Sequence, residues 1–500
     1  MIKEFKFLVN KYRTAVPAKE FPTFLLTKDT WDDYGHKVKY QLKYFTEDGF
    51  EIYIGPVKIL HHVESSEQPR SVEQSTNLEH IFTSLDTSHV SLGQDDEYYT
   101  NLYSHFGKDA SKILDCLNDL ALHPDLALTF EASPAFRNAL VRENGAQRAR
   151  RFGLALSSGK KINENTSFEY IGSITGATSE TEAHFDFDGR DLIPGRIVAI
   201  IGRNAVGKTQ FLASLAEDLA QITRTSSARI NERDSRFPSG RPLYTRVIAI
   251  SYSAFDKFKR PAVDSAASYI YCGIRNDKGS LSLSTLNKTY ESNLQRIRDR
   301  GLEEDWIHHM EEILGDFNED ITASLKGEIY TKQPTPNALS VLSSGQSILA
   351  HLVTALLAWI QPSSMILFDE PETHLHPNAV ASLFIVLSNI LKKHDSYAVV
   401  ATHSPVVIQE VPAKRVLVFH REENATTAQS LETESFGESV SELTRQVFET
   451  IDIKSVYRGT LKKLAQRESI EKVLSRFELG LSMSAEAYLL AQYSKKAARK

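Results

Sequence analysis

Two glycines, a lysine and a threonine stand at fixed spacing between an apolar run and a helical pattern. The loop Gly202-Arg203-Asn204-Ala205-Val206-Gly207-Lys208-Thr209 follows the run Ile197–Ile201, and Gln210 leads into the helical pattern. Glycine lets backbone N–H groups approach phosphate oxygens, and the helix that follows presents its positive end to them. The lysine can reach the β- and γ-phosphates, and the threonine hydroxyl can bind Mg²⁺. We therefore expect residues 202–210 to bind the phosphates of a nucleotide, with Thr209 on the metal.

Two carboxylates end a second apolar run, and a histidine follows a third. Asp369 and Glu370 come after Met365–Phe368, and His403 lies just beyond Tyr397–Ala401. Ligands of open α/β sheets bind where the carboxyl ends of the strands meet. We expect Asp369 to hold Mg²⁺, directly or through water, and Glu370 to orient or deprotonate an attacking water. His403 is expected to contact the γ-phosphate, so Glu370 and His403 are the predicted catalytic residues.

A short polar string precedes a long helical pattern between these motifs. Ser343, Ser344, Gly345 and Gln346 lie directly before a helix whose apolar positions are Ile348, Leu349, Leu352, Leu356 and Leu357. By itself such a string is typical of a helix start. This string also lies between the phosphate loop and the carboxylates, which distinguishes it from an ordinary helix start.

The elements around these motifs predict an α/β protein in three parts. Alternating residues from Lys37 to Tyr44 and the turn Asp48-Gly49 predict a β-hairpin, and helical patterns follow from about residue 77. We expect an N-terminal β-hairpin plus helical region over residues 1–165, a phosphate-loop ATPase core over 166–412, and a mainly helical C-terminal region over 413–500. Residues 283–328 are expected to be helical, without the sustained heptads of a coiled-coil arm.

The composition of the chain argues against a secreted, a disulfide-rich and a membrane-spanning protein. The chain has 500 residues, a net charge of −6 and two cysteines, Cys116 and Cys272, which give no metal-ligand spacing and no disulfide framework. The N-terminus lacks the apolar core of a signal peptide, and no uncharged apolar run is long enough to span a bilayer. The expected location is the cytoplasm, with no membrane partner.

One local cluster is basic although the chain is acidic overall. It comprises Arg142, Arg148, Arg150, Arg151, Lys160 and Lys161. Such a cluster could bind nucleic acid or phosphate. The absence of interleaved aromatic residues favours a solvated helix face instead.

Together the motifs GRNAVGKT, LSSGQ, MILFDEPETHLHP and ATHSP resemble the ABC-type ATPase heads, in the branch shared by SMC-type DNA-repair ATPases and OLD-family proteins. The resemblance covers about residues 190–410. It implies ATP and Mg²⁺ as cofactors and a homodimer whose two heads bind the nucleotides between them. It also implies that Ser343, Ser344 and Gly345 act on the partner's γ-phosphate, and that Glu372 to His374 lie at the dimer interface.

The chain departs from this family at one position. The family usually has a glutamine after the strand that follows the phosphate loop, where it contacts Mg²⁺ or the lytic water. Here the predicted strand Val247–Ile250 is followed by Ser251-Tyr-Ser-Ala-Phe-Asp256. Ser253 or Asp256 could substitute, and the departure leaves open a scaffold that binds ATP and hardly turns it over.

Within this family, the chain has neither the coiled-coil arms of SMC proteins nor the Toprim motifs of OLD nucleases, and it has no membrane segment of a transporter. It resembles stand-alone ATPase subunits of anti-phage systems, such as PtuA of Septu and of Septu-like retron systems, with the ATPase component of PARIS as a related alternative. The segment from Glu434 to Phe448 is similar to those proteins. This resemblance implies a separate HNH-type nuclease and, for a retron, a reverse transcriptase with its RNA–DNA product. The alternative is an SMC-like DNA-repair clamp without a dedicated nuclease.

Overall fold

The computed structural model describes most of the chain and divides it into two compact units, residues 1–440 and 441–500. The described residues are 5–10, 20–30, 32–33, 35–63, 71–72, 75–130, 133–160, 162, 167–190, 193–220, 227–253, 257–260, 269–273, 283–314, 319–331, 342–448 and 456–497. Each unit is considered by itself.

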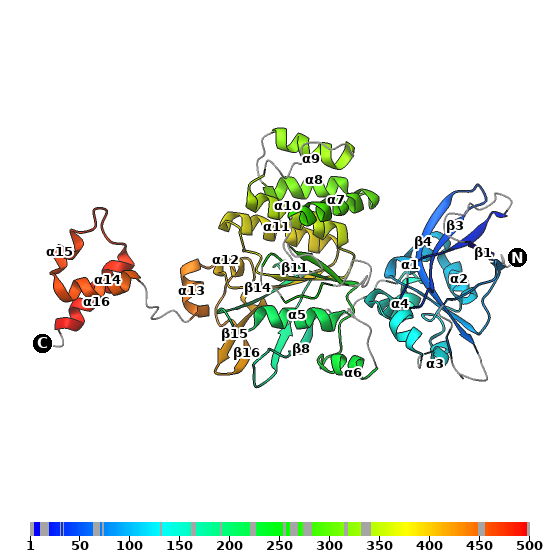
Figure 1. The fold of residues 1–500 in the computed structure, drawn as a ribbon, viewed down its shortest axis with the longest axis horizontal. Helices are drawn as coiled ribbons and strands as arrows, with labels where there is room; N and C mark the ends of the chain where they lie inside the picture. The colour runs from blue at the N-terminus through cyan, green and yellow to red at the C-terminus, as the bar shows by residue number, and fades with distance from the viewer. Residues whose placement is uncertain are drawn as a thin grey trace. The chain divides into compact units, whose positions relative to one another are not determined.

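The first unit begins with a mixed sheet covered by helices (Figure 1). Its strands are β1 (Phe7–Asn10), β2 (Thr23–Lys28), β3 (Lys39–Phe45), β4 (Glu51–Val63), β5 (Ser71–Val72), β6 (Ile81–Phe82) and β7 (His89–Gly93). The strand order is β5-β4-β3-β2-β1-β6, and β7 pairs with β4. The helices of this region are α1 (Asp96–Phe106), α2 (Ala110–Cys116), α3 (Ala127–Phe130) and α4 (Asn144–Leu156). We call strands β1–β7 and helices α1–α4 the N-terminal domain.

The predicted hairpin is confirmed within this sheet. Strands β3 and β4 pair antiparallel, and Gly49 between them has a φ of 80°, which glycine adopts without a steric penalty. Val38, Tyr40 and Leu42 are fully buried, as their alternation with polar residues predicts. These side chains join those of the helices in one apolar core.

The central sheet brings the three chemical motifs to one edge. Its strands are β10 (Ile197–Gly202), β11 (Arg246–Ser251), β12 (Tyr269–Gly273), β13 (Ser364–Asp369), β14 (Tyr397–Thr402), β15 (Val416–Glu422) and β16 (Ala425–Ser430). The order is β12-β11-β13-β14-β10-β15-β16, and every neighbouring pair except β15–β16 is parallel. Because β14 lies between β10 and β13, the carboxyl ends of these three strands are adjacent.

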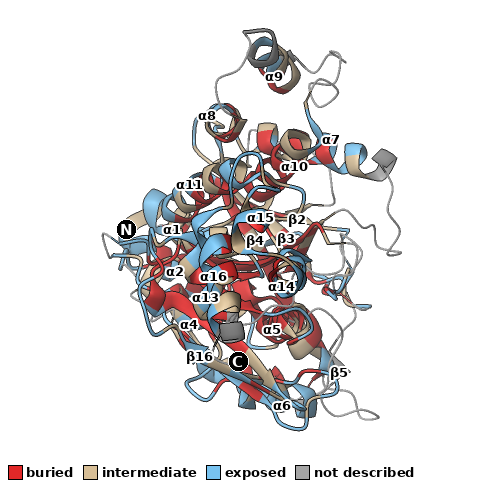
Figure 2. Ribbon diagram, turned by 90° about the vertical axis from the view of Figure 1, so that its left-hand side faces the viewer, coloured by how far each residue is buried: buried red, intermediate tan, exposed pale blue. Residues whose placement is uncertain are grey.

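Helices cover both faces of this sheet. Figure 1 shows α5 (Lys208–Leu219) on one face and the helices that precede and follow β13 on the other. The second group comprises α7 (Leu283–Asp299), α8 (Glu303–Leu314), α9 (Glu319–Thr331), α10 (Ser344–Trp359) and α11 (Pro377–Lys393). Burial on both faces explains why β10, β11, β13 and β14 are buried along their whole length. Figure 2 colours buried residues red. Shorter elements of the unit are α6 (Ser227–Ser235), α12 (Pro405–Ile408) and the hairpin of β8 (Phe168–Gly172) with β9 (Thr181–Phe185).

The central sheet continues beyond residue 412, the expected end of the ATPase core. Strand β15 pairs in parallel with β10, and β16 returns antiparallel to it, so residues 416–430 are strands rather than part of a mainly helical region. Val416–Phe419 are buried, because β15 lies against the phosphate-loop strand. On the structure, we draw the core to about residue 430.

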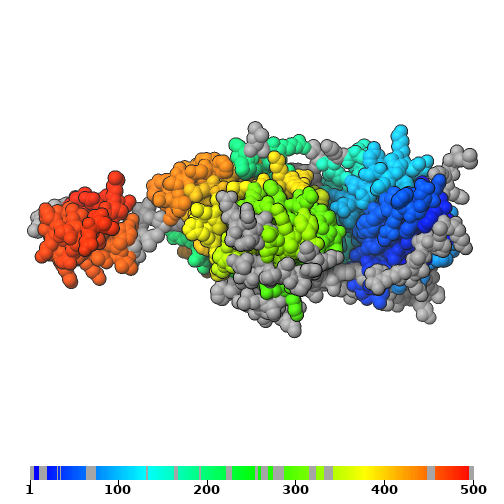
Figure 3. All heavy atoms as spheres, turned by 90° about the horizontal axis from the view of Figure 1, so that it is seen from above, coloured from blue at the N-terminus to red at the C-terminus, as the bar shows by residue number. Residues whose placement is uncertain are grey.

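The second unit is helical. It contains α14 (Val456–Arg467), α15 (Ile470–Leu474) and α16 (Met483–Ala497), and α13 (Val440–Phe448) spans its first residues. Figure 3 shows the atoms of residues 456–497, orange to red, gathered into one rounded body. Its small apolar core contains Leu461, Ala465, Val473, Ala485 and Leu489.

Candidate functional site

The phosphate loop leaves no room for side chains at its two glycines. A Cβ atom at Gly202 would lie 2.5 Å from the carbonyl oxygen of Phe419, and one at Gly207 would lie 2.5 Å from Cγ2 of Ile174. Gly207 also has a φ of 101° at the start of α5. Ala205 lies between them and has a φ of 68°. This backbone conformation is energetically unfavourable for any residue that has a side chain. The close packing and the left-handed residues therefore hold the backbone in a tight turn.

Lys208 is buried beneath this loop. Its Nζ donates to the carbonyl oxygens of Gly202 at 2.8 Å and Arg203 at 3.1 Å. Burial lowers the pKa of Lys208, and the nearby carboxylates of Glu370 and Asp369 oppose that shift. The lysine is thus a desolvated cation at the loop, where it can bind an anion strongly.

Asp369 and the phosphate loop are in direct contact. Thr209 Oγ1 donates to Asp369 Oδ1 at 3.0 Å, across 160 residues of sequence. Asp369 ends β13, and only 1% of it is exposed. A hydroxyl and a carboxylate at this separation are the oxygen donors that Mg²⁺ prefers.

Glu370 and His403 also meet at this edge, as predicted. His403 Nδ1 lies 3.5 Å from Glu370 Oε1. Glu370 has a φ of 52°, and its backbone N–H donates to the carbonyl of Ala401 on β14. The left-handed backbone at a glutamate is strained, and such strain is characteristic of functional residues.

Glu372 lies closer to the histidine than Glu370 does, and its role was not predicted. Its Oε1 accepts from Thr402 Oγ1 at 2.6 Å and from the backbone N–H of His403 at 3.1 Å, and it lies 3.3 Å from His403 Nδ1. The resemblance assigned Glu372 to the dimer interface. Within one chain it fixes the loop that carries His403.

The string at residues 343–346 begins α10 and forms a complete capping box. Ser343 Oγ accepts from the backbone N–H of Gln346, and the Gln346 side chain accepts from the backbone N–H of Ser343. A Cβ atom at Gly345 would lie 3.4 Å from the carbonyl oxygen of His374, so the start of α10 lies beside the turn after Asp369 and Glu370. Ser344 is exposed at the first position of the helix.

Three further side chains make contacts around the loop, and the sequence analysis had assigned only Gln210 among them. Gln210, predicted to contact nucleotide, accepts from the backbone N–H of Thr175 at 3.0 Å. Arg421 of β15 donates to the carbonyl of Gly176 at 3.0 Å, and Thr426 of β16 donates to that of Val206 at 3.2 Å. No motif identifies Thr175, Arg421 or Thr426, because their positions depend on the pairing of β15 and β16 with the sheet.

The residues proposed to replace the missing glutamine follow β11. Ser253 lies two residues beyond Ser251, which is paired with Asp369 in the sheet register. The backbone N–H of Ser253 donates to Ser251 Oγ at 3.2 Å. Ser253 therefore lies near the carboxylate edge, whereas Asp256 is outside the described residues.

The predicted basic cluster is not a nucleic-acid surface over its first two residues. Arg142 and Arg148 are 2% and 4% exposed. Arg148 donates to Asp96 Oδ2 and to the carbonyl of Leu243, which joins the N-terminal domain to the core. Arg148 lies on the buried face of α4, so the prediction of a solvated helix face was wrong for this residue. A run of basic residues in the sequence does not reveal which of them have partners inside the protein. Arg151 and Lys160 are exposed, and Lys161 is outside the described residues.

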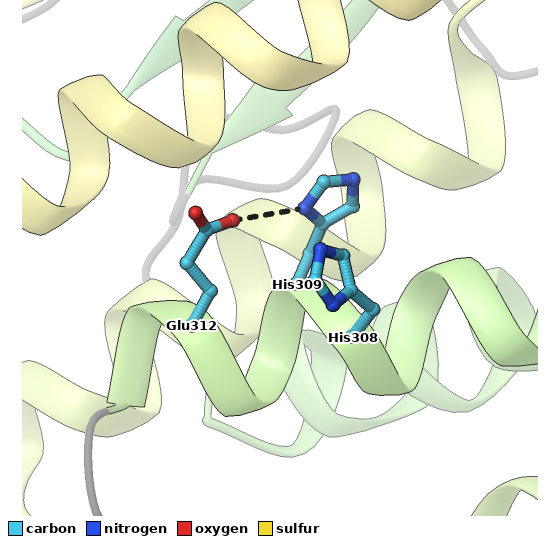
Figure 4. A group of neighbouring side chains, drawn as sticks. All are labelled: His308, His309 and Glu312. Carbon is cyan, nitrogen blue, oxygen red and sulfur yellow. Dashed lines mark hydrogen bonds and ion pairs between the residues drawn. The ribbon is translucent and has the colours of Figure 1, made fainter.

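A second group of potential ligands lies on α8, away from the loop. His308, His309 and Glu312 have ligand atoms within 4.8 Å of one another, and all three project from one helix (Figure 4). His309 Nδ1 lies 3.4 Å from Glu312 Oε2, and Asn389 of α11 donates to Glu312 Oε1 at 3.0 Å. Burial lowers the pKa of His309. Because the carboxylate is already engaged from both helices, we assign these contacts to the packing of α8 on α11.

Known proteins resemble the chain in two ways. A family model described as "AAA domain, putative AbiEii toxin, Type IV TA system" matches residues 273–409, the segment that contains Ser343, Asp369 and His403. Protein ea59 of Escherichia phage lambda is 26% identical over 515 residues, which cover 95% of this chain and 96% of the phage protein. The similarity to an ATPase domain therefore begins after the phosphate loop, and the similarity to the phage protein extends over nearly the whole chain.

The solved structures that match the chain are more distant in sequence. CbiO1 from Clostridium perfringens, part of the ABC transporter complex cbiONQ, is 14% identical with a TM-score of 0.26, covering 61% of this chain and 96% of that one. The SMC head domain from Thermotoga maritima is 11% identical with a TM-score of 0.29, covering 53% and 99%. The observed strands show that the fold is α/β, with a mostly parallel central sheet that carries the phosphate-loop motif at its carboxyl edge. Among the described helices, none is long and apolar enough to cross a membrane.

Proposed function

We propose that this chain binds ATP with Mg²⁺ at the carboxyl edge of its central sheet and hydrolyses it. The observation that carries the proposal is the 3.0 Å contact between Thr209 Oγ1 and Asp369 Oδ1. It joins the two motifs that the sequence predicts to hold the metal. Two oxygen donors this close, beside a buried lysine, are suited to a metal-bound triphosphate.

The residues present fit this cofactor. Gly202 and Gly207 allow the tight turn of the loop, since a Cβ at either position would clash with Phe419 or Ile174, and the N–H groups of such a loop at a helix N-terminus can bind phosphate. When bound, ATP with Mg²⁺ supplies the phosphoanhydride bond to be cleaved and a cation on its oxygens. Lys208 then exchanges a loop carbonyl for a phosphate oxygen, Glu370 accepts the proton of the attacking water, and His403 contacts the terminal phosphate.

Nucleotide binding is proposed to close a homodimer of two heads. Ser343, Ser344, Gly345 and Gln346 begin α10, where hydroxyls and backbone N–H groups can donate to the partner's nucleotide. ATP can shift the open–closed equilibrium only through a difference in affinity between the two states. Contacts made only in the closed dimer supply that difference.

We propose that this dimer is the regulatory or sensor subunit of an anti-phage defence complex. Its partner would be a separately encoded nuclease of the HNH type, with a reverse transcriptase and its RNA–DNA in a retron system. The match to a family model named for the AbiEii toxin supports a role in defence. The similarity to a phage lambda protein is compatible with a defence gene that a phage itself carries.

The alternative is an SMC-like DNA clamp with no dedicated nuclease. It predicts an ATPase rate that DNA increases and DNA binding that weakens with salt. This alternative would bind DNA through the region from Arg148 to Lys161, and the burial of Arg148 removes one of its residues.

The test is a pull-down of the tagged chain from its native operon, with and without ATP, followed by a nuclease assay of the bound proteins. Lys208→Ala serves as the matched control, since it removes the phosphate contact and leaves the rest of the chain unchanged. We expect a nuclease that co-purifies and whose activity changes with ATP for the wild type only. A chain that is recovered alone, with DNA-stimulated ATPase activity, would establish the clamp instead.

A further inference from the structure

The C-terminal unit differs in charge from the rest of the chain. Residues 441–500 contain twelve lysines and arginines and seven aspartates and glutamates, whereas the whole chain contains 58 and 64. The unit is therefore basic and the remaining residues are acidic. Such asymmetry within one chain indicates a segment that interacts with nucleic acid or with a membrane surface.

Four of these twelve basic residues lie on one helix. Helix α14 carries four basic residues and no acidic one. Leu461 and Ala465 are its buried residues, and Lys462, Lys463 and Arg467 are exposed. Like charges four residues apart, such as Lys463 and Arg467, destabilise a helix. The basic face therefore has a cost for folding, which a ligand of opposite charge would offset.

These charges are not neutralised within the unit. In the described part of the chain, no hydrogen bond or ion pair engages the side chains of Lys462, Lys463 or Arg467. By contrast, Arg476 forms an ion pair with Glu468. Arg445 likewise pairs with Glu442. The unit thus pairs two of its arginines and leaves the charges of Lys462, Lys463 and Arg467 facing solvent.

An aromatic side chain lies at the start of the same helix. Tyr457 is 47% exposed. The guanidinium of Arg458 lies 5.8 Å from the centroid of the Tyr457 ring and 5.4 Å from that of Tyr488, and its Nε donates to the Tyr457 hydroxyl. Exposed aromatic rings beside cationic side chains are typical of surfaces on which bases stack.

We propose that the exposed face of α14, formed by Lys462, Lys463 and Arg467, binds the phosphate backbone of a nucleic acid, with Tyr457 beside it. A membrane surface fits this helix less well. Interfacial helices bury an apolar face in lipid, and the apolar face of α14, Leu461 and Ala465, is already buried in the core of the unit. The site is separate from the ATPase site and does not depend on the function proposed there.

The test measures binding of the full-length chain, without nucleotide, to fluorescently labelled duplex DNA, single-stranded DNA and duplex RNA between 50 and 200 mM NaCl. Three phosphate contacts predict a loss of affinity for a duplex of about 40-fold over this range. The double variant Lys462→Glu/Lys463→Glu should bind at least about 10-fold more weakly at 50 mM NaCl and reduce the logarithmic salt slope by about two.

The matched control is Arg151→Glu/Lys160→Glu, which changes the same amount of charge in the basic cluster that the sequence analysis singled out. Both control residues are exposed. We expect the control to bind like the wild type, and the ranking of the three probes identifies the kind of nucleic acid. The proposal is wrong if no probe binds, or if the control loses affinity while the α14 variant does not. Circular dichroism melting of each variant separates lost binding from lost folding.

Discussion

Two buried lysines in the first unit differ in what surrounds their charge. Lys58 of β4 and Lys208 of α5 are 3% and 7% exposed, and burial lowers the pKa of both. Lys58 Nζ lies 2.8 Å from Asp33 Oδ2, and the same carboxylate accepts from Arg142. Lys208 donates only to two backbone carbonyls, and no carboxylate of the described residues lies within ion-pair distance of its Nζ. The first cation is compensated inside the protein, and the second is prepared for an anion from outside.

The backbone φ angles also differ between the phosphate loop and the N-terminal domain. Around the phosphate loop, Ala205, Glu370 and His374 have left-handed φ values of 68°, 52° and 68°. In the described residues of the N-terminal domain, only glycines and Asn118 have positive φ. Asparagine and glycine tolerate this conformation and histidine is enriched in it, whereas alanine and glutamate adopt it rarely. Three such residues therefore lie around the phosphate loop, and Ser363, Asp395 and Glu423 adopt the same conformation in other turns of the first unit.

Exchanging each lysine for methionine tests the comparison directly, with each variant as the other's control. Lys208→Met should abolish ATP turnover and weaken ATP binding by at least about 100-fold, because a charge-assisted phosphate contact is lost. Its free energy of unfolding should be unchanged or higher. Lys58→Met should retain ATP binding and lose about 3–5 kcal/mol of that free energy, because a buried ion pair is broken.

Isothermal titration with ATP and Mg²⁺ measures the affinities, and urea unfolding followed by circular dichroism measures the stabilities. The comparison fails if the two effects are exchanged, with Lys208→Met unfolding the protein or Lys58→Met abolishing ATP binding.

Glu370→Gln should produce the next largest effect on turnover. It keeps the size of the side chain and removes the base, so we expect kcat to fall by about 10²–10⁴-fold with little change in ATP affinity. Phosphate release measures the rate. Glu423→Gln is the matched control, because Glu423 is exposed and has a similar φ of 51° in the turn between β15 and β16. Equal rates for Glu370→Gln and the wild type would remove Glu370 from the mechanism.

Sequence alone predicted the parts of this site that depend on local spacing. The phosphate loop, Asp369, Glu370 and His403 each follow a buried strand, and parallel pairing brings their strand ends together. Contacts that depend on tertiary packing were missed. Glu372 turns back to Thr402, a partner thirty residues further along the chain.

The N-terminal domain shows the same limit. The hairpin of β3 and β4 followed from alternation and a glycine turn, since both are local signals. The burial of Arg148 could not be predicted from local signals, because its partners Asp96 and Leu243 are 52 and 95 residues away in sequence. The strands β15 and β16 were also missed, since their short apolar run is stabilised by pairing with β10 rather than by its own pattern.

Glu372→Gln should have a smaller effect than Glu370→Gln, because Glu372 is a positioning residue. Weakening its charge-assisted hydrogen bonds to Thr402 and His403 costs about 1–2 kcal/mol, which predicts a fall in kcat of about 5–30-fold with KM nearly unchanged. A double-mutant cycle with His403→Ala supplies the decisive measurement. If Glu372 acts through the histidine, its replacement should change kcat little when His403 is already absent. Additive losses would show that Glu372 acts elsewhere.

Asp119→Asn should have no effect on turnover, yet it should change the pH dependence of stability. Asp119 is fully buried in the N-terminal domain, where the Tyr99 hydroxyl and the backbone N–H groups of Ala121 and Gly93 donate to it. Burial raises the pKa of Asp119 from 3.8 to about 7. The folded state therefore holds this proton up to neutral pH, whereas the unfolded chain releases it near pH 4.

Raising the pH from 4 to 7 consequently favours the unfolded chain at this position, and above pH 7 the contribution becomes constant. The difference in unfolding free energy between wild type and Asp119→Asn should fall over this window and then level off, while ATP turnover of the two proteins stays equal. Urea unfolding at pH 4.5, 5.5, 6.5 and 7.5, with phosphate release at the upper values, measures both. A difference that does not vary with pH would mean that Asp119 is ionised throughout, and a change in turnover would mean that the N-terminal domain's buried charges serve the ATPase site after all.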